Sequence, residues 1–334
     1  MRITIAARRS ELARIQAYLV GEALGKAHPE VCIDYSFHES LGDRNQTDPL
    51  WQMPEKGVFT QDLRDGLIAE QFDLAVHSWK DLSIEENADT QIVATLPRAD
   101  MRDVLLVRRD RWDDIDRTGR LRILTSSPRR SYNLESFLPQ VLPANLAALE
   151  FVPVRGNVPT RVRKMWQPNA DGLVVAKAAL DRLLETEREE FAATSADLRR
   201  TLSECRWMVL PLITNPAAPG QGALAIEIKR VRQDLRDLLA VINCGDTFQS
   251  VVREREILSA FGGGCHQKIG VSVLQRAYGE ITSLRGLAED GAILSNYSLY
   301  SSGPQPPRVF RDKMWPLALS EADWFARESI PVTL

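Results

Sequence analysis

Short apolar segments alternate with amphipathic segments through the first two thirds of the chain, and this alternation constrains the fold more than any other feature. Residues 31–38 alternate like a strand, residues 172–176 form a compact apolar strand, and Leu12 and Ile15 lie at helical spacing. Strands that alternate with helices form parallel sheets whose faces the helices cover. Because 334 residues are too many for one core, we expect two or three domains, two of them α/β units with a cleft between them.

Two connecting segments divide the chain further. Residues 97–101 are predicted to connect the two α/β units, and the proline- and glycine-rich residues 215–222 form a second linker. Beyond this linker the pattern changes to a charged helix over 251–261, three alternating stretches, and a late helix over 317–327. The change predicts a smaller α+β domain over 246–334 with an antiparallel sheet.

The composition is that of an ordinary globular protein and excludes several classes. With a net charge of −3 the chain lacks the basic surplus of a nucleic-acid binder, and its longest apolar runs are too short to span a bilayer. No signal peptide is visible, and four cysteines without CxxC spacing indicate free thiols in a reducing cytosol. Four scattered histidines give no zinc cluster. We therefore expect a cytoplasmic protein without nucleic-acid, membrane or metal partners.

Arginines and hydroxyl side chains gather where predicted strands end. Ser127 and Pro128 follow one strand and are a good N-cap and first residue for a helix. A helix start with free N–H groups, hydroxyls and adjacent arginines is an anion site. Solvated surface arginines are the alternative, but ligands of α/β sheets bind at strand carboxyl ends, so we predict a small polyanionic ligand. Three strand ends share this layout and together present Arg8, Arg9, Arg129, Arg130, Arg155 and Arg161.

Two further places carry chemically informative residues. Lys80 and Asp81 set a cation beside a carboxylate at another strand end, where one can hold an anion and the other can handle a cation or a proton. A surface turn is the commoner origin of such a pair, and the preceding His77 is more often a satisfied core group than a catalyst. Cys265 follows three glycines, which leave its thiol without side-chain cover. The alternative is an incidental cysteine in a tight turn.

Seven short runs occur together in one order along the chain. They are Arg8–Ala13, Lys56–Phe59, Ala75–Asp81, Thr125–Arg130, Arg155–Arg161, Pro219–Ala223 and Gly263–Cys265. Together these runs resemble the hydroxymethylbilane synthase family, also called porphobilinogen deaminases. The resemblance implies two domains of the type II periplasmic-binding fold with a cleft between them, the first over 1–98 and 222–241 and the second over 102–216.

The resemblance also implies an activity and a site. Family members join four porphobilinogen molecules head to tail on a dipyrromethane cofactor held by a cysteine thioether, and hydrolysis then releases hydroxymethylbilane. Cys265 matches that cysteine, and Asp81 would be the catalytic group that stabilises the cationic azafulvene and acts in proton transfer. The cofactor would be bound by Cys265, Lys80, Asp81, Thr125, Ser126, Ser127, Arg129, Arg130 and Gly156, and the substrate by Arg8, Ser10, Phe59, Arg155, Arg161 and Gln221. We expect a monomer that hands its product to uroporphyrinogen-III synthase.

The chain departs from the family pattern without losing a residue assigned to chemistry. Leu41 stands where the family has an arginine, at the start of a predicted mobile loop over 40–55, and Arg44 follows closely. Such departures keep a paralogue of low or no activity as an alternative. A non-catalytic organic-acid-binding protein of the same two-lobed shape is a second alternative, which would explain the arginines but not Cys265 or Asp81.

Overall fold

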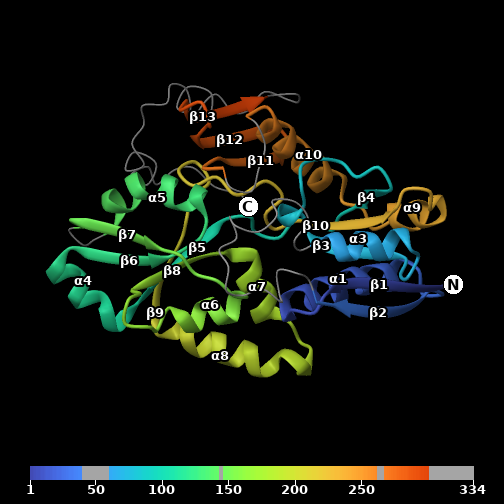
Figure 1. Cartoon of the computed structure of the whole chain (residues 1–334), viewed down its shortest axis with the longest axis horizontal. Helices are drawn as coiled ribbons and strands as arrows, with labels where there is room; N and C mark the ends of the chain where they lie inside the picture. The colour runs from blue at the N-terminus through green and yellow to red at the C-terminus, as the bar shows by residue number, and fades with distance from the viewer. Residues whose placement is uncertain (40–59, 143–145, 262–266, 301–334) are drawn as a thin grey trace.

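The computed structural model describes residues 1–39, 60–142, 146–261 and 267–300 (Figure 1). Within these ranges the strands form two five-stranded sheets and one three-stranded antiparallel sheet. The predicted architecture, two α/β units with a smaller antiparallel unit, is confirmed. We call each five-stranded sheet with its helices a lobe. No helix of the described ranges is long and apolar enough to cross a membrane.

The first lobe is built on the strand order β2-β1-β3-β10-β4. Its strands are β1 (Arg2–Arg8), β2 (Cys32–His38), β3 (Leu74–Ser78), β4 (Thr90–Ala94) and β10 (Leu224–Lys229), and its helices are α1 (Glu11–Ala27), α3 (Gln61–Ile68) and α9 (Gln233–Ala240). A short 3-10 turn, η2 (Trp79–Asp81), follows β3 directly. The lobe therefore closes only when the chain returns to it in β10.

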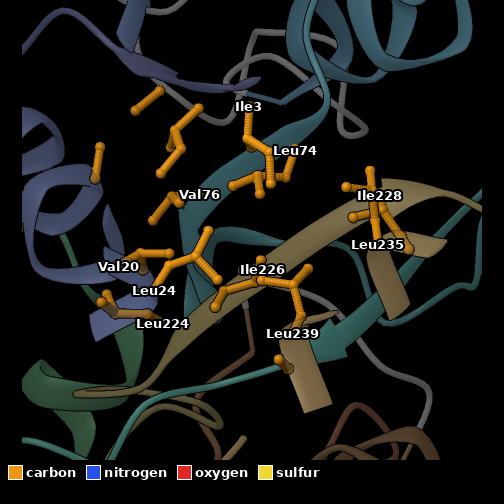
Figure 2. Packing of buried hydrophobic residues seen from close by; sticks show 14 of the residues in the cluster. Ile3, Val20, Leu24, Leu74, Val76, Leu224, Ile226, Ile228, Leu235 and Leu239 are labelled. Carbon is orange, nitrogen blue, oxygen red and sulfur yellow. The ribbon is translucent and has the colours of Figure 1, made fainter. Parts of the chain in front are cut away.

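Aliphatic side chains hold the first lobe together (Figure 2). Ile5 of β1 lies in a buried cluster with Leu24 of α1 and Leu235 of α9. The next residue, Ala6, packs in a separate cluster with Leu63 of α3. Because successive side chains of a strand point to opposite faces, α1 and α9 cover one face of the sheet and α3 covers the other. Each fully buried aliphatic side chain contributes about 1.5–3 kcal/mol to folding.

The second lobe repeats this arrangement in the strand order β7-β6-β8-β5-β9. Its strands are β5 (Asp103–Arg108), β6 (Arg120–Leu124), β7 (Ala148–Val152), β8 (Gly172–Ala176) and β9 (Cys205–Val209). Its helices are α4 (Trp112–Thr118), α5 (Pro128–Val141), α6 (Val158–Lys164), α7 (Lys177–Glu185) and α8 (Ala192–Ser203), with 3-10 turns η3 (Arg109–Arg111) and η4 (Glu189–Phe191). In Figure 1 the two lobes stand side by side, the second in green.

Each lobe contains one reversed strand, which the sequence pattern did not predict. β10 runs antiparallel to β3 and β4, and β5 runs antiparallel to β8 and β9. The expectation of parallel sheets was wrong at these two strands. The reason is that β5 and β10 each follow a crossover from the other lobe, whereas a parallel neighbour requires a covering helix between the strands.

The two crossovers, residues 97–101 and 215–222, lie against each other between the lobes. Gly222 has a φ of +87°, and a Cβ at this position would lie 2.5 Å from the carbonyl oxygen of Ala99. The N–H of Ala99 donates a hydrogen bond to the carbonyl oxygen of Gly222 at 3.3 Å. Only glycine combines this backbone conformation with so close an approach.

The third unit is joined to the crossovers by a buried carboxylate. It consists of α10 (Gly245–Ser259), β11 (Gly270–Arg276), β12 (Gly279–Leu287) and β13 (Ile293–Tyr300). Glu254 of α10 is fully buried and accepts hydrogen bonds from Arg98 at 2.7 and 2.8 Å. It also accepts from the N–H groups of Gly220 at 2.8 Å and Val273 at 2.9 Å. One side chain thus holds both crossovers and β11.

Several elements differ from the predictions. α10 begins at Gly245 and ends at Ser259, whereas the predicted helix covers 251–261. Residues 245–247 carry no large apolar side chain, so periodicity could not find the start of the helix. The elements β4, β9, α4, α8 and α9 were not predicted. The predicted loop over 40–55 and helix over 317–327 lie outside the described residues.

Candidate functional site

One cavity of about 400 Å³ gathers most of the predicted site residues between the lobes. Most lining segments follow the carboxyl end of a strand: the turn after β1, η2 after β3, the start of α5 after β6, residues 155–161 after β7, and the start of α7 after β8. This is the edge where ligands of α/β sheets bind. Of the predicted residues, the cavity is lined by Arg8, Ser10, Lys80, Asp81, Arg130, Arg155, Gly156, Arg161 and Gln221.

The cavity is strongly cationic. Its described lining holds six basic side chains against the one carboxylate of Asp81: Arg8, Lys80, Arg130, Arg155, Arg161 and Arg182. Burial and the charge of Arg130 lower the pKa of Arg161 to about 10, against the opposing effect of Asp81, so Arg161 remains charged at neutral pH. Guanidinium groups bind carboxylates in pairs of parallel hydrogen bonds. The lining therefore suits a ligand that carries several carboxylates.

Lys80 and Asp81 are neighbours with different surroundings. Burial lowers the pKa of Lys80 to about 8, although the carboxylate of Asp81 opposes the shift. Lys80 Nζ donates a hydrogen bond to Gln221 Oε1 at 3.3 Å. Asp81 is exposed, and among the described residues its carboxylate has no hydrogen-bond or ion-pair partner. Asp81 also lines a smaller adjoining cavity of about 80 Å³. Its carboxylate is therefore available to a ligand.

Asp103, the first residue of β5, fixes the cavity's central arginine. It is fully buried and accepts hydrogen bonds from Arg130 Nη2 at 2.7 Å and Arg129 Nη2 at 2.9 Å. The side-chain amides of Asn215 and Gln221 also donate to it, each at 2.9 Å. Burial would raise the pKa of Asp103, but Arg130 and Arg129 hold it well below its usual range. An ionised Asp103 thus orients both Arg130 and Gln221 at the cavity wall.

The two predicted arginines of α5 have different positions. Arg130 lines the cavity, whereas Arg129 is absent from its described lining. Arg129 Nη1 donates to the carbonyl oxygen of Pro216 at 2.7 Å and to Asn215 Oδ1 at 3.3 Å. Arg129 therefore holds the second crossover against the second lobe, which is a positioning role.

The hydroxyl run before α5 shapes the turn without joining the described lining. Ser127 is the N-cap of α5, as predicted, and its Oγ accepts from the N–H of Arg130 at 3.5 Å. Ser126 Oγ donates to the carbonyl oxygen of Val154 at 2.7 Å and accepts from its N–H at 2.8 Å. Thr125 is buried, and its Oγ1 accepts from the N–H of Ser127 at 3.3 Å. These bonds join the turns after β6 and β7.

Three other predicted positions complete the comparison. Cys265 and Phe59 lie outside the described residues, so their assignments stay predictions. His77 is a buried core group of β3, with Nε2 at 3.0 Å from a carboxylate oxygen of Glu227. Its structural interpretation therefore fits better than a catalytic one.

Sequence reasoning missed Arg182 and Gln16 in the cavity lining. Arg182 lies on α7, which follows β8, and its Nη2 donates to the carbonyl oxygen of Gly222 at 2.7 Å. Burial lowers the pKa of Arg182 to about 10. The turn from β8 to α7 is a further strand end in the lining, but no hydroxyl run marks it in the sequence. Gln16 of α1 donates to Ser78 Oγ at 2.9 Å, and nothing in its local sequence distinguishes it from other polar helix residues.

Comparisons with known proteins agree on one family. The family model described as porphobilinogen deaminase, dipyromethane cofactor binding domain, matches residues 3–237, which include every described cavity residue. The porphobilinogen deaminase of Clostridium novyi (strain NT) is 32% identical over 301 residues, covering 90% of this chain and 92% of the relative. That of Syntrophus aciditrophicus (strain SB) is 34% identical over 284 residues, covering 85% and 83%. That of Natranaerobius thermophilus is 32% identical over 284 residues, covering 85% and 81%.

Proposed function

The chain belongs to the porphobilinogen deaminase family, whose members are transferases, and from this premise we propose that it is a hydroxymethylbilane synthase. It joins four porphobilinogen molecules head to tail on a dipyrromethane primer and releases hydroxymethylbilane by hydrolysis. The cationic cavity carries this proposal. Each pyrrole bears an acetate and a propionate, so a growing chain gathers carboxylates, and six basic side chains line the space between the lobes.

The donor set of the cavity fits the dipyrromethane that the family model names. Two linked pyrroles present several carboxylates, and basic side chains from both lobes face one volume of about 400 Å³. When bound, the group supplies the primer's free pyrrole end. In this proposal Cys265 attaches the group, and Lys80, Arg130 and Gly156 hold it beside Asp81. Arg129 and the hydroxyls of residues 125–127 act by positioning the start of α5.

Asp81 is the proposed catalytic group. Loss of ammonia from porphobilinogen leaves a positively charged carbon on the substrate, within a ligand that is otherwise anionic. The exposed carboxylate of Asp81 stabilises that positive charge and exchanges a proton with the leaving amine or the pyrrole N–H. The substrate carboxylates are held by Arg8, Ser10, Arg155, Arg161 and Gln221, with Phe59 near the rings.

The mass of the intact protein tests the attachment at Cys265. Because a thioether survives denaturation, the purified protein should be heavier than its sequence by two linked pyrrole units. Cys265→Ser should lose this excess, whereas Cys32→Ser, a change at an exposed thiol, should keep it. An Ehrlich-type pyrrole test should give colour with the wild type and with Cys32→Ser but not with Cys265→Ser. A bare chain mass would count against the proposal.

Turnover of porphobilinogen distinguishes a working enzyme from a paralogue of low or no activity. A protein that carries the pyrrole excess but forms no bilane from porphobilinogen would be a paralogue that keeps the cofactor without activity. Release of bilane by a protein that carries the pyrrole mass excess supports the proposed function. An organic-acid-binding protein would show neither the mass excess nor bilane release.

The perturbed pKa of Lys80 predicts a specific pH dependence. A lysine whose pKa is lowered to about 8 is charged below that pH and neutral above it. We expect kcat/KM for porphobilinogen to fall as the pH rises through about 8, because Lys80 loses the charge that holds a carboxylate of the dipyrromethane beside Asp81. Lys80→Arg should flatten this limb of the profile, since an arginine keeps its charge. A wild-type profile that is level between about pH 7 and about pH 9 would contradict the assignment.

Three further expectations remain proposals. We propose domains over 1–98 with 222–241, over 102–216 and over 246–334, and the pairing of β10 with β3 and β4 supports the split first domain. We also propose a cytoplasmic monomer that passes its product to uroporphyrinogen-III synthase, on the basis of the sequence alone.

A further inference from the structure

A second cavity, of about 450 Å³, lies behind the η2 turn and shares no described lining residue with the first. Trp79 lines it, whereas the next two residues, Lys80 and Asp81, line the first cavity. We call it the rear cavity. Its walls come from the first lobe and α10, and its described lining includes Arg64, Trp79, Thr90, Ile92, Glu227, Phe248, Val252 and Arg255.

One part of the rear cavity is apolar. Trp79 is only 2% exposed, and its ring meets the ring of Phe248 edge to face at a centroid distance of 5.1 Å. Ile92 of β4 and Val252 of α10 extend this surface. A flat or branched apolar group would lose water against these side chains and gain the favourable free energy of burial.

Two donor groups in the lining of the rear cavity lack an acceptor among the described residues, and one of them is a buried atom. This atom is the indole Nε1 of Trp79. Arg64, which is 8% exposed, donates from Nε to Glu227 Oε1 at 2.8 Å, but its two terminal nitrogens have no hydrogen bond within the described chain. A buried indole N–H is normally satisfied, so a ligand that supplies an anionic oxygen would remove the cost at Trp79 and could also pair with the guanidinium of Arg64.

The other charged groups at the base of the rear cavity already have partners. Glu227 accepts hydrogen bonds from Arg64 and from Thr90 Oγ1 at 2.6 Å. Burial would raise its pKa, but His77, Arg64 and Thr90 hold it at about 2, so it is fully ionised. Arg255 donates to the carbonyl oxygens of Leu82 and Ser83. Glu227 Oε2 lies 3.0 Å from His77 Nε2, so the lining groups that still lack a partner among the described residues are N–H donors.

The rim of the rear cavity has the opposite polarity. Three glutamates there are exposed: Glu85, Glu86 and Glu256. Their charges repel a ligand whose outer end is negative and tolerate one whose outer end is neutral. A ligand with one inward carboxylate therefore fits better than a polycarboxylate, in contrast to the first cavity.

We propose that the rear cavity is a binding site for a small monocarboxylate with a flat apolar body. Its carboxylate accepts hydrogen bonds from Trp79 Nε1 and the terminal nitrogens of Arg64, and its body packs against Phe248, Ile92 and Val252. Because Trp79 belongs to the same 3-10 turn as Lys80 and Asp81, the site lies two residues away from the proposed catalytic group along the chain. This proposal stands independently of the proposed reaction.

Indole NMR of the full chain tests the site directly. The protein labelled with ¹⁵N-tryptophan has seven indole N–H signals to resolve, and the one missing in Trp79→Phe belongs to Trp79. Titration with benzoate should move that signal downfield in a saturable way, as its N–H gains a charged acceptor. Benzyl alcohol, which has the same ring without the charge, should bind about tenfold more weakly or worse, since hydrogen bonds to charged groups are the stronger ones.

Three variants test whether benzoate binds in the rear cavity or in the first cavity. Val252→Trp fills the rear cavity from a partly exposed position, so it should abolish the benzoate shift without lowering the melting temperature appreciably. Arg161→Gln changes the first cavity only, so it should leave the titration of Trp79 unchanged. In Trp79→Phe, the methyl signal of Ile92 should report at least about tenfold weaker binding of benzoate. A Trp79 signal that does not move, that responds equally to benzyl alcohol, or that still shifts in Val252→Trp overturns the proposal.

Discussion

Replacing Asp81 with asparagine is expected to lower the turnover of porphobilinogen roughly a hundredfold or more, because the substitution removes both a negative charge and a proton acceptor. The side chain is exposed and has no partner among the described residues, so its loss should not disturb folding. Single-turnover and steady-state rates of Asp81→Asn measure the effect, and an unchanged melting temperature shows that the fold persists.

A matched control separates chemistry from surface charge. Asp89 is also exposed and lies in the same lobe, but it does not line the cavity, so Asp89→Asn should turn over at nearly the wild-type rate. Normal turnover in Asp81→Asn would refute the catalytic assignment. Equal losses in both variants would point to a general charge effect.

Replacing Asp103 with asparagine is expected to destabilise the second lobe by about 3–5 kcal/mol, because removing one partner leaves buried charges uncompensated. Arg129 and Arg130 would keep their positive charges, at 4% and 7% exposure, and would have no carboxylate to balance them. Urea denaturation followed by circular dichroism measures the shift. We also expect a weaker affinity for porphobilinogen, since Arg130 and Gln221 lose their common acceptor.

The control for Asp103→Asn is another aspartate of the same lobe. Asp114 pairs with Arg111 and Arg117 on the surface, where such ion pairs contribute little, so Asp114→Asn should cost at most about 1 kcal/mol. If both variants shifted the midpoint equally, the buried network would not have the role assigned to it.

The features that local sequence determines could be predicted. β8 occupies residues 172–176, as its compact apolar run indicates, and Ser127 caps α5 with Pro128 at the first helical position. Strand periodicity, helix caps and proline preferences depend on a few neighbouring residues, so they can be read from the sequence without knowing the tertiary contacts. The same logic placed Arg8, Lys80 and Arg155 at strand ends, and all of them line the cavity.

The assignments that depend on distant residues could not be predicted in the same way. Arg129 and Arg130 are adjacent and both pair with Asp103. The difference between them arises from Asn215 and Pro216, 86 and 87 residues from Arg129, which of the two arginines bind Arg129 alone. Arg182 was missed because its place in the lining depends on how α7 packs beneath the second crossover. Tertiary contacts decide which member of an arginine pair faces a ligand.

The doubled connection between the lobes has a mechanical consequence. Two backbone segments in direct contact, at Ala99 and Gly222, resist twisting much more than bending, as a two-leaved hinge does. Any relative motion of the lobes should therefore be a rotation about one line through the crossovers. Glu254 bonds α10 to that line, and Val251 of α10 also packs against Trp79 and Ala225 of the first lobe. The second lobe, with Arg130 and Arg161, would therefore swing past Lys80 and Asp81 while α10 stays with the first lobe.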